Sequence, residues 1–293
     1  MTPTVHLVDA SPYIFRAYFS LPDSITDPGG RPVNAVHGFV GFLLKLIDDE
    51  TPTHLAVAFD ESLTTSFRNE IYPEYKAQRE APPAELKAQL QDCRDVAVAL
   101  GAATFAHPRY EADDLIATLR ERVRADDCDV VVVSGDKDLA QLVDEKTTFF
   151  DFAKGLRYRA AEVEAKFGVR PDQIVDLLAL MGDSVDNIPG VKGVGQKSAV
   201  ALLGRFGSLS SLYERLDKVE DLPLRGAKSL RRKLDVGRDS AILSWRLADA
   251  ARDIDIDADL ESLRFRGADR ASIDALFERL GFDTLAGRIR RWA

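Results

Sequence analysis

The sequence contains very little cysteine and histidine for its length of 293 residues. Its two cysteines, Cys93 and Cys128, lie far apart and form no CxxC pair, so we expect reduced packing residues rather than a disulfide or a zinc site. The four histidines are scattered and form no HExxH pair. A disulfide-stabilised fold and zinc chemistry are therefore both disfavoured.

Long hydrophobic runs are also missing. No apolar segment approaches the roughly 20 residues that cross a bilayer. The first residues, MTPTVHLVDAS, lack the basic and apolar segments of a signal peptide, so we expect a cytoplasmic protein without a membrane partner. Positive charge is in deficit too, because the net charge is −9, which argues against a uniformly basic nucleic-acid binder.

Three apolar, strand-like runs each end in aspartate. TVHLVD ends at Asp9, HLAVAFD ends at Asp60, and DVVVVSGDKD continues past its valines to Asp136 and Asp138. Such continuous Val, Leu and Ala runs are typical of parallel strands that helices cover on both faces. Helical periodicity in residues 34–50 and 84–100, and in a third stretch that begins in the acidic cluster of YEADDL and continues to Val123, separates the runs and predicts an α/β domain. Open α/β sheets bind ligands at the carboxyl ends of their strands, where these aspartates fall.

The character of the sequence changes near residue 160. One more strand is predicted at residues 147–152, and helices are predicted at residues 171–181, 208–216 and 226–250. We see no internal repeat and expect two lobes within one compact unit.

Nine acidic residues lie near the predicted strand ends, helix starts and turns. They are Asp9, Asp60, Glu111, Asp113, Asp114, Asp136, Asp138, Asp183 and Asp186. Converging carboxylates repel one another unless cations neutralise them. Oxygen ligands without Cys or His select hard ions, so we expect Mg²⁺, for which Mn²⁺ can substitute. Two such ions about 4 Å apart suit the attack of water on a phosphodiester. These nine carboxylates account for as many negative charges as the net charge of −9, so the rest of the protein is near neutral overall. The acidic net charge is therefore weak evidence against DNA binding.

A simpler interpretation exists for the acidic cluster in YEADDL, residues 110–115. Acidic side chains in a first helical turn are favoured by the helix macrodipole. Glu111 and Asp114 are three apart and can share a face, while Asp113 points elsewhere. Because other acids lie at related strand ends, we interpret the cluster as one wall of a two-metal site, with Asp113 as the candidate bridge.

The segment IPGVKGVGQKSA, residues 188–199, has glycines spaced for a tight turn before an amphipathic helix. Amides at the start of that helix can bind phosphate, and Lys192 and Lys197 add positive charge. The pattern is that of a helix-hairpin-helix, which grips phosphates without reading bases. A turn that uses glycine for steric reasons alone is the alternative, and the preceding acidic GDSVD favours the phosphate interpretation. No Walker pattern is present.

A third segment, TSFRNEIYPEYKAQREAPP, mixes basic and aromatic residues after the strand that ends at Asp60. Arg68, Lys76 and Arg79 can meet phosphates, and Tyr75 can stack on an exposed base. Taken alone, the segment is equally consistent with a solvated surface loop.

Together these motifs resemble, in their order, those of the 5′-to-3′ exonuclease domain of bacterial DNA polymerase I and its flap-endonuclease relatives. The segments are VHLVD, AVAFD, FRNEIYPEYKAQR, YEADDL, SGDKDLAQL, MGDSVDNIPGVKGVGQKSA and the later RGAKSLRRKL. The resemblance implies a PIN-like α/β core at residues 1–160, with a mostly parallel sheet flanked by helices and a helical arch around residues 62–90. It also implies a helix-three-turn-helix DNA-binding subdomain at residues 161–293, with its hairpin around residues 182–204.

The activity implied by the resemblance is structure-selective cleavage of DNA near 5′ ends or flap junctions with two Mg²⁺. Asp9, Asp60, Glu111 and Asp113 would surround the first metal. Asp113, Asp136, Asp138 and Asp186 would surround the second, with Asp114 and Asp183 acting directly or through water. Lys76 and Arg79 match arch residues that steer the scissile phosphate.

The resemblance further implies K⁺ in the hairpin, held by the main-chain carbonyls of Leu180, Met181, Pro189, Val191 and Val194. It implies DNA contacts by Arg16, Arg68, Tyr75, Lys192, Gly193, Val194, Gly195, Gln196, Lys197 and Ser198. The expected partners are 5′ flaps, nicked or gapped duplexes and 5′ ends, bound by a monomer that serves DNA replication or repair. Two alternatives are a non-catalytic DNA-structure binder, disfavoured by the complete acid set, and a PIN-type ribonuclease, disfavoured by the hairpin. Whether the chain is free-standing or an excised domain stays open.

Overall fold

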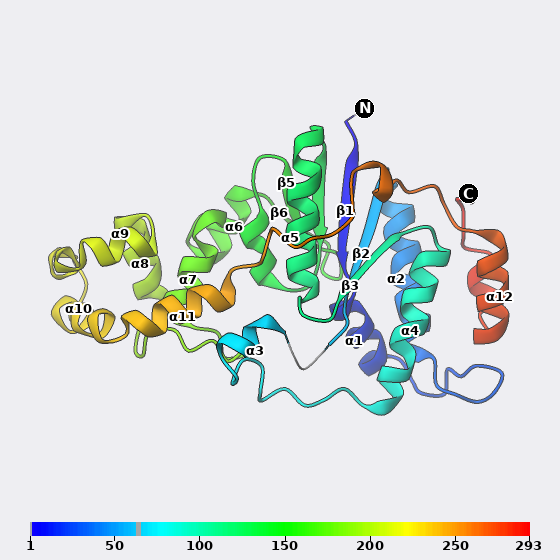
Figure 1. Cartoon of the computed structure of the whole chain (residues 1–293), viewed down its shortest axis with the longest axis horizontal. Coiled ribbons are helices and arrows are strands. Elements are labelled where there is room, and N and C mark those ends of the chain that lie inside the picture. Colours follow the sequence, from blue (N-terminus) through cyan, green and yellow to red (C-terminus); the bar gives the residue numbers. More distant parts are fainter. Residues whose placement is uncertain (1, 63–65) are drawn as a thin grey trace.

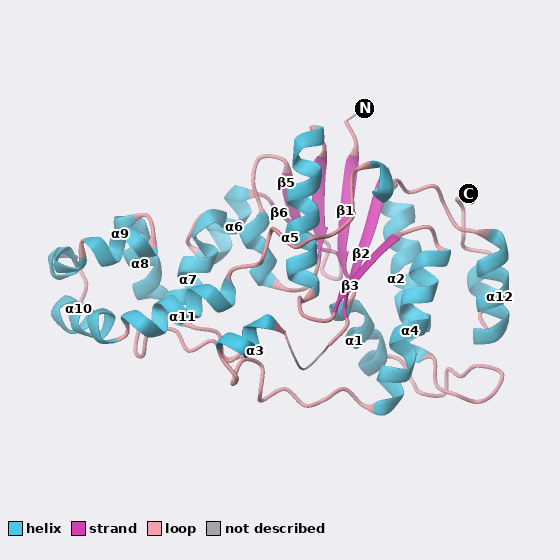
Figure 2. Ribbon diagram, viewed as in Figure 1, coloured by secondary structure: helices cyan, strands magenta, loops and turns pink. Residues whose placement is uncertain are grey.

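The chain folds around a six-stranded sheet, seen at the centre of the larger lobe in Figures 1 and 2. This computed structural model describes residues 2–62 and 66–293. The strand order is β3-β2-β1-β4-β5-β6, and only β6 runs antiparallel to its neighbour. The strands are β1 (Thr4–Asp9), β2 (His54–Asp60), β3 (Ala103–His107), β4 (Asp129–Val133), β5 (Thr147–Asp151) and β6 (Leu156–Tyr158). The predicted mostly parallel α/β sheet is confirmed.

Helices cover both faces of the sheet and form a second lobe beside it (Figure 2). The α-helices are α1 (Ser11–Ser20), α2 (Asn34–Glu50), α3 (Phe67–Ile71), α4 (Ala84–Ala99), α5 (Ala112–Val123), α6 (Ala160–Phe167), α7 (Ile174–Met181), α8 (Gln196–Phe206), α9 (Leu209–Glu214), α10 (Ala227–Val236), α11 (Arg238–Ala248), α12 (Arg270–Leu280) and α13 (Asp283–Ala286). The 3-10 helices are η1 (Arg124–Asp126), η2 (Lys137–Leu142), η3 (Pro171–Gln173), η4 (Leu216–Asp221) and η5 (Glu261–Leu263). In the described residues, no helix combines the length and apolar character needed to cross a membrane.

Alternate residues of each strand enter two separate hydrophobic cores, as the two-residue period of a strand requires. On β1, Val5 and Leu7 join the core beneath α5, and this core continues into the helical lobe. Val8 joins the other core, beneath α1, α2 and α4. Asp9 has the same parity as Val5 and Leu7, so its side chain points to the α5 side of the sheet.

The structure differs from the predicted elements in several places, and β6, α6 and α12 are among the elements that were not predicted. The stretch at residues 226–250 is two helices, α10 and α11, which meet at Gly237. A Cβ at Gly237 would lie 2.7 Å from Val191 Cγ1, so the break allows the hairpin to approach closely. Strand β3 and helix α1 were not predicted, because ATFAH is short and weakly apolar and SPYIFRAYFS begins directly after a strand.

The predicted arch is helical only at its two ends. Helix α3 begins at Phe67, where the Ser66 side chain accepts a hydrogen bond from the Arg68 amide, and α4 begins at Ala84. Residues 72–83 run between them as turns and irregular chain because Pro73, Pro82 and Pro83 interrupt any helix there. Residues 63–65, which the arch prediction also covers, lie outside the described residues.

The last part of the chain returns to the sheet. Helix α12 packs against α4 at the right of Figure 1, and Phe265, Ile273 and Phe277 enter the core beneath α2 and α4. The Phe265 amide also donates to the Thr53 carbonyl at 3.0 Å. The division of the chain at residue 160 stays a prediction, and residues 261–293 pack with the α/β lobe rather than with the helical lobe.

Candidate active site

The carboxyl ends of β1 and β2 bring Asp9 and Asp60 together. The two strands pair in parallel and end at the same edge of the sheet, and both aspartates point to the side that α5 covers. Ser11 links them, since its amide donates to Asp9 Oδ1 at 3.1 Å and its hydroxyl donates to Asp60 Oδ2 at 2.6 Å. The first two predicted acids are therefore held in one fixed arrangement.

The end of β4 adds the SGDKD acids to the same edge. The Ser134 hydroxyl donates to Asp9 Oδ2 at 2.7 Å and accepts from the Asp136 amide at 2.9 Å. Asp136 then begins η2 as its N-cap, with Oδ1 accepting from the Asp138 amide at 2.9 Å. This cap fixes Asp136 beside the strand ends.

Helix α5 begins at this edge with the acidic cluster. Glu111 is the N-cap residue, and its amide donates to Asp114 Oδ2 at 3.0 Å. Asp113 faces a cavity of about 360 Å³, which Asp9, Asp60, Glu111 and Asp136 also line. Asp114 thus accepts a hydrogen bond within the first turn of α5, whereas Glu111 and Asp113 line the cavity.

A neighbouring cavity of about 340 Å³ contains the remaining predicted acids. Asp136, Asp138, Asp183 and Asp186 line it, and Asp136 belongs to both cavities. Asp183 and Asp186 come from the loop between α7 and α8, in the helical lobe. Each lobe therefore supplies part of this second cavity.

Burial and mutual repulsion raise the pKa of several of these carboxyl groups. The pKa of Asp9 rises to about 8 because the group is buried and lies near Asp60 and Asp136. The pKa of Asp138 rises to about 7 through burial and the charge of Asp136, and the pKa of Asp113 rises for the same two reasons. Burial also raises the pKa of Asp60. Ionising the cluster at neutral pH thus requires added positive charge.

Three cations approach the acids from the rim of the two cavities. Lys76 Nζ lies 2.7 Å from Glu111 Oε1, and Lys137 Nζ lies 2.7 Å from Asp183 Oδ2. Arg79 forms an ion pair with Asp186. Burial raises the pKa of Glu111, but Lys76 and Arg68 outweigh this effect and leave the pKa below its usual value. With these cations in place, the acids within residues 2–62 and 66–293 are not drawn into a group of three that could hold a metal ion.

A strap made of residues 74–79 crosses the site and is fixed to the hairpin loop. Lys76 has a φ of 54°, a conformation rare outside glycine, and its amide donates to the Asp186 carbonyl at 3.1 Å. Gln78 donates to the Ser184 and Val185 carbonyls at 3.1 and 2.9 Å. These contacts hold Lys76 and Arg79 at the mouth of the acidic cavities.

Arg68 and Asp114 lie outside the cavities, which corrects two predictions. Arg68 is 3% exposed and Asp114 is 0% exposed. The Arg68 guanidinium donates to both oxygens of Asp114 and to the Leu247 and Asp249 carbonyls. In this structure Arg68 is therefore not available to DNA, and Asp114 holds Arg68 rather than facing a metal position.

Two further predicted DNA contacts differ in their placement. Tyr75 is 4% exposed, and its hydroxyl donates to Glu111 Oε2 at 3.0 Å and to Asp186 Oδ2 at 3.3 Å, so its ring is not presented to a base. Arg16 is exposed on α1 and lines a separate cavity with Phe42 and Lys45. The predicted contact by Arg16 stays a prediction.

The hairpin has the close backbone contacts that its glycines predicted. A Cβ at Gly190 would lie 2.3 Å from the Gly182 nitrogen, and Gly190 has a φ of 60°. Gly195 is the N-cap of α8, and Lys192 and Lys197 are exposed beside it. The other predicted residues of the turn, Gly193, Val194, Gln196 and Ser198, lie in the same loop and first helical turn.

The predicted K⁺ site concerns carbonyls around the same turn. The Leu180 carbonyl accepts from the Val191 amide at 2.9 Å, and the Val191 carbonyl accepts from the Val194 amide at 2.9 Å. Met181 and Pro189 flank the contact between Gly182 and Gly190. The potassium site stays a prediction.

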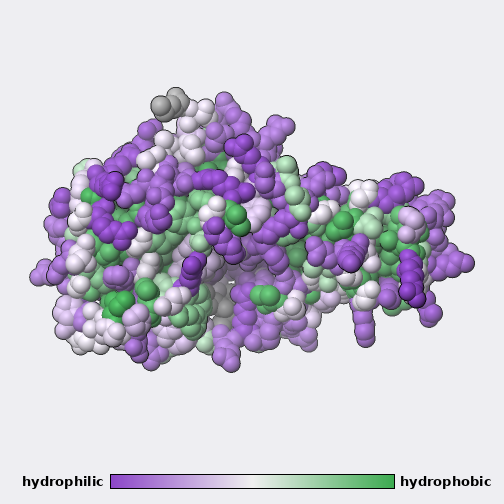
Figure 3. Space-filling model, turned by 180° about the vertical axis from the view of Figure 1, so that it is seen from behind, coloured by the Kyte–Doolittle hydropathy of each residue, from purple (hydrophilic) through white to green (hydrophobic). Residues whose placement is uncertain are grey.

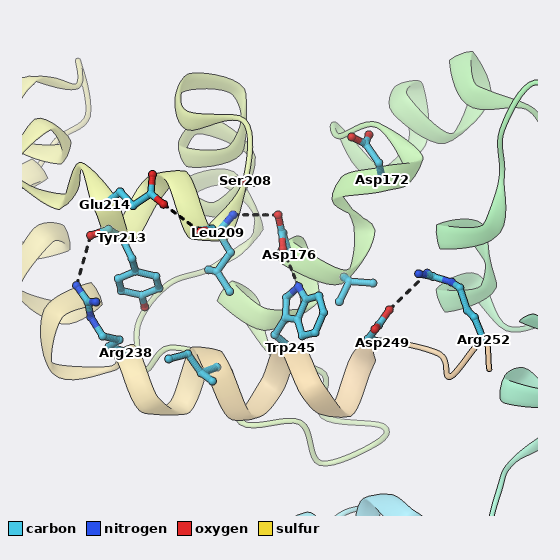
Figure 4. A pocket seen from close by; sticks show the side chains of 13 residues that line it. Asp172, Asp176, Ser208, Leu209, Tyr213, Glu214, Arg238, Trp245, Asp249 and Arg252 are labelled. Carbon is cyan, nitrogen blue, oxygen red and sulfur yellow. Dashed lines mark hydrogen bonds and ion pairs between the residues drawn. The ribbon is translucent and has the colours of Figure 1, made fainter. Parts of the chain in front are cut away.

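A larger cavity, of about 680 Å³, lies in the helical lobe between α7, α9 and α11 (Figure 4). Asp176 connects its walls, because Oδ1 accepts from Trp245 Nε1 at 3.0 Å and Oδ2 accepts from the Leu209 amide at 2.9 Å. None of the predicted site residues lines this cavity. Its size therefore does not mark it as the reaction site.

The supporting residues Ser11, Ser134 and Lys137 were not predicted. Each lies inside or next to a motif that was used, since Ser11 follows VHLVD and the other two belong to SGDKD. In the sequence, the only sign of their role is a hydroxyl or ammonium group close to a predicted carboxylate. Ordinary turns have the same residues at the same spacing, so this sign does not identify a supporting residue.

The arrangement of these acids on a parallel sheet, with a hairpin lobe beside them, is shared with known nucleases. Residues 4–168 match the N-terminal resolvase-like domain of the 5′-3′ exonucleases, and residues 169–271 match their C-terminal SAM fold. The chain belongs to the 5′-3′ exonuclease family, a family of metal-dependent nucleases. It is 41% identical to DNA polymerase I of Bacillus subtilis over 97% of this chain and 32% of that protein. It is 43% identical to DNA polymerase I of Pseudomonas aeruginosa over 94% of this chain and 30% of that protein. The chain thus spans about a third of the length of these relatives.

Solved structures with the same fold include T5 nucleases and the catalytic core of Rad2. The T5 5′-exonuclease with bound zinc matches with a TM-score of 0.68 and 22% identity, over 97% of this chain and 96% of that one. A bacteriophage T5 flap endonuclease complex with DNA and metal ions gives a TM-score of 0.69 at 22% identity, over 97% and 96% of the two chains. The catalytic core of Rad2 in complex with DNA gives 0.61 at 17% identity, over 97% and 91%. These TM-scores establish a shared fold.

Proposed function

We propose that the chain hydrolyses DNA phosphodiesters near 5′ ends or flap junctions by a two-metal-ion mechanism. One observation carries the proposal: all the predicted acids except Asp114 face two adjoining cavities that share Asp136. Relatives with this fold have been solved with divalent metal ions and with DNA. Family membership and the acidic cavities therefore support the same activity.

The residues present fit a pair of hard divalent ions, Mg²⁺ or, in its place, Mn²⁺. The donors are carboxylate oxygens alone, which Mg²⁺ prefers. The raised pKa of Asp9, Asp113 and Asp138 indicates an excess of negative charge that divalent ions would relieve. Lys76, Arg79 and Lys137 now neutralise part of that charge, so loading the ions requires these three ion pairs to separate.

When bound, the two ions supply a nucleophilic hydroxide at neutral pH and stabilise the attacking and leaving oxygens. Asp9, Asp60, Glu111 and Asp113 would hold one ion, and Asp113, Asp136, Asp138 and Asp186 would hold the other, with Asp183 acting directly or through water. Asp113 would contribute to both ions, because it lines the first cavity together with Asp136, and Asp136 also lines the second. Lys76 and Arg79, once released from Glu111 and Asp186, are placed by the strap to bind and orient the scissile phosphate.

The hairpin would grip the duplex through its phosphates. Lys192 and Lys197 are exposed, and the first amides of α8 point out of the helix start where phosphate binds well. K⁺ held by hairpin carbonyls would fix the turn in place. The chain would act as a monomer on 5′ flaps, nicked or gapped duplexes and 5′ ends, in DNA replication or repair.

End-labelled 5′-flap, nicked and single-stranded DNA substrates test this proposal, with Mg²⁺ and with EDTA, by the lengths of the products. We expect Mg²⁺-dependent cuts near the flap junction or the 5′ end. Binding without cleavage at any Mg²⁺ or Mn²⁺ concentration would identify a non-catalytic DNA-structure binder. Cleavage of RNA in preference to matched DNA would identify a ribonuclease instead.

A further inference from the structure

Helix α10 is a short basic helix at the far end of the helical lobe (Figure 1). Leu230 and Leu234 are buried and attach it to the lobe, while Lys228 and Arg232 are exposed. Because Lys228 and Arg232 are four residues apart, they lie on one face of the helix, opposite the two leucines. This face of the helix thus presents two positive charges to solvent, with the exposed Asp235 beside them.

The C-terminal half of α10 is joined to the hairpin. Lys233 Nζ donates to the Gly193 carbonyl at 3.2 Å, and the position after α10, Gly237, packs against Val191. Gly193 and Val191 flank Lys192, the predicted phosphate contact. Helix α10 is therefore attached to the hairpin beside Lys192, while Lys228 and Arg232 stay exposed.

The charges on this joined surface are not neutralised by neighbours. Across the described ranges, no carboxylate forms an ion pair with Lys192, Lys197, Lys228 or Arg232. Elsewhere on the same lobe exposed cations are paired, as Arg170 is with Asp172 at 2.9 Å and Lys218 with Asp217 at 3.3 Å. On the face of the molecule in Figure 3, the helical lobe shows hydrophilic side chains with hydrophobic patches between them.

We infer that α10 is a second phosphate-binding element, which extends the contact of the hairpin with duplex DNA away from the acidic cavities. The inference rests on the proposed function, because the hairpin must carry DNA for α10 to extend it. Lys228 and Arg232 would neutralise two phosphates without reading bases. The 10 residues of α10 span about 15 Å, which corresponds to about four further base pairs.

The test compares Lys228→Ala/Arg232→Ala with the control Lys218→Ala/Arg170→Ala, which removes the same charge from the same lobe. Lys233 is left intact because it supports the hairpin. Binding is measured by fluorescence anisotropy in Ca²⁺, with flap substrates whose duplex arms are shortened in turn from about 16 to about 6 base pairs, at several salt concentrations.

We expect the α10 variant to weaken binding about 10-fold and to reduce the slope of log K against log salt by about 2, for long arms only. Once one of the two duplex arms is shorter than a threshold length, the variant and the wild type should bind the substrate equally well. The control should match the wild type at every length. A loss that is independent of arm length, or a slope equal to that of the control, overturns the inference.

Thermal unfolding of both variants shows whether they fold, and the charge-reversed Lys228→Glu/Arg232→Glu variant should enlarge the same length-dependent loss. Failure of the proposed function is distinguishable, because it would appear as absent cleavage by the wild type in Mg²⁺. The arm-length readout in Ca²⁺ does not depend on cleavage.

Discussion

Arg68 holds both carboxylate oxygens of Asp114, with Nη1 and Nη2 each 2.8 Å from one oxygen. The pair is buried at the junction of three elements, since Asp114 begins α5, Arg68 lies in α3, and the Leu247 and Asp249 carbonyls close the end of α11. Arg68 Nη1 also donates to Glu111 at 3.0 Å. The buried pair therefore fixes one wall of the acidic cavity to the helical lobe.

Replacing Arg68 with Lys should destabilise the protein, because an ammonium cannot make the two parallel hydrogen bonds and leaves Asp114 partly unpaired. We expect a loss of about 3 kcal/mol in the free energy of unfolding, measured with urea. Arg109→Lys is the matched control, because Arg109 binds both oxygens of Glu70 at 2.9 and 2.8 Å on the exposed surface. This variant should lower the free energy of unfolding by at most about 1 kcal/mol. Equal losses for the two variants would contradict the structural role of Arg68.

The stability of the metal-free protein should fall as the pH rises from about 4 to about 8. Asp9 has a folded-state pKa of about 8 against an ordinary value of 3.8, so the folded protein binds more protons than the unfolded chain between these values. The free energy of unfolding then decreases with pH. Thermal unfolding in EDTA across this range measures the slope. Asp9→Asn should flatten it, saturating Mg²⁺ should reverse it, and a rising profile in EDTA would contradict the prediction.

Asp136→Asn should nearly abolish cleavage while it leaves flap binding in Ca²⁺ largely intact. Asp136 lines both acidic cavities, so its loss removes charge from both proposed metal positions. We expect a decrease in rate of more than about 100-fold, beyond the range for residues that only orient metal ligands. Single-turnover kinetics with a flap substrate measure it, and retained turnover would remove Asp136 from the metal role.

Lys192→Ala combined with Lys197→Ala should weaken duplex binding and reduce its salt dependence. Each lost phosphate contact lowers the slope of log K against log salt by about 0.9, so the double variant should change it by about 2. Anisotropy titrations at several salt concentrations give the slope. An unchanged slope would show that these two lysines do not touch phosphates.

Gly190→Ala should disrupt the hairpin and the binding of duplex DNA. The new Cβ would lie 2.3 Å from the Gly182 nitrogen, and a φ of 60° is unfavourable for alanine. Gly204→Ala in α8 is the control, because nothing lies within 4 Å of its Cβ and alanine favours a helix, so it should stabilise the protein by up to about 1 kcal/mol. Calorimetry measures the stability of both variants, and anisotropy measures their binding of duplex DNA. If Gly190→Ala is as stable and binds as well as Gly204→Ala, the steric argument is wrong.

The sequence predicted those parts of the fold that depend on local pattern. The apolar runs that end at Asp9 and Asp60 became strands β1 and β2, and the parallel pairing of these strands follows from the alternation of strands with helices. The same pattern placed most of the acids at one edge of the sheet. Spacing and residue type were sufficient because these features repeat within a few residues.

Other parts depend on contacts between distant segments, which no local pattern reveals. Arg68 meets the Leu247 carbonyl, and Tyr75 meets Asp186, so both residues are buried although basic and aromatic residues in a loop suggested contact with DNA. The break at Gly237 likewise depends on the approach of Val191. Burial of a side chain is a property of the assembled fold, and it decided the roles of these residues.

Lys137 contacts Asp138 of the sheet lobe at 3.2 Å and Asp183 of the helical lobe at 2.7 Å. One acidic cavity is thus lined by residues of both lobes, which share a continuous hydrophobic core. In the proposed function, a duplex bound to the hairpin would therefore act directly on the spacing of the acids in that cavity.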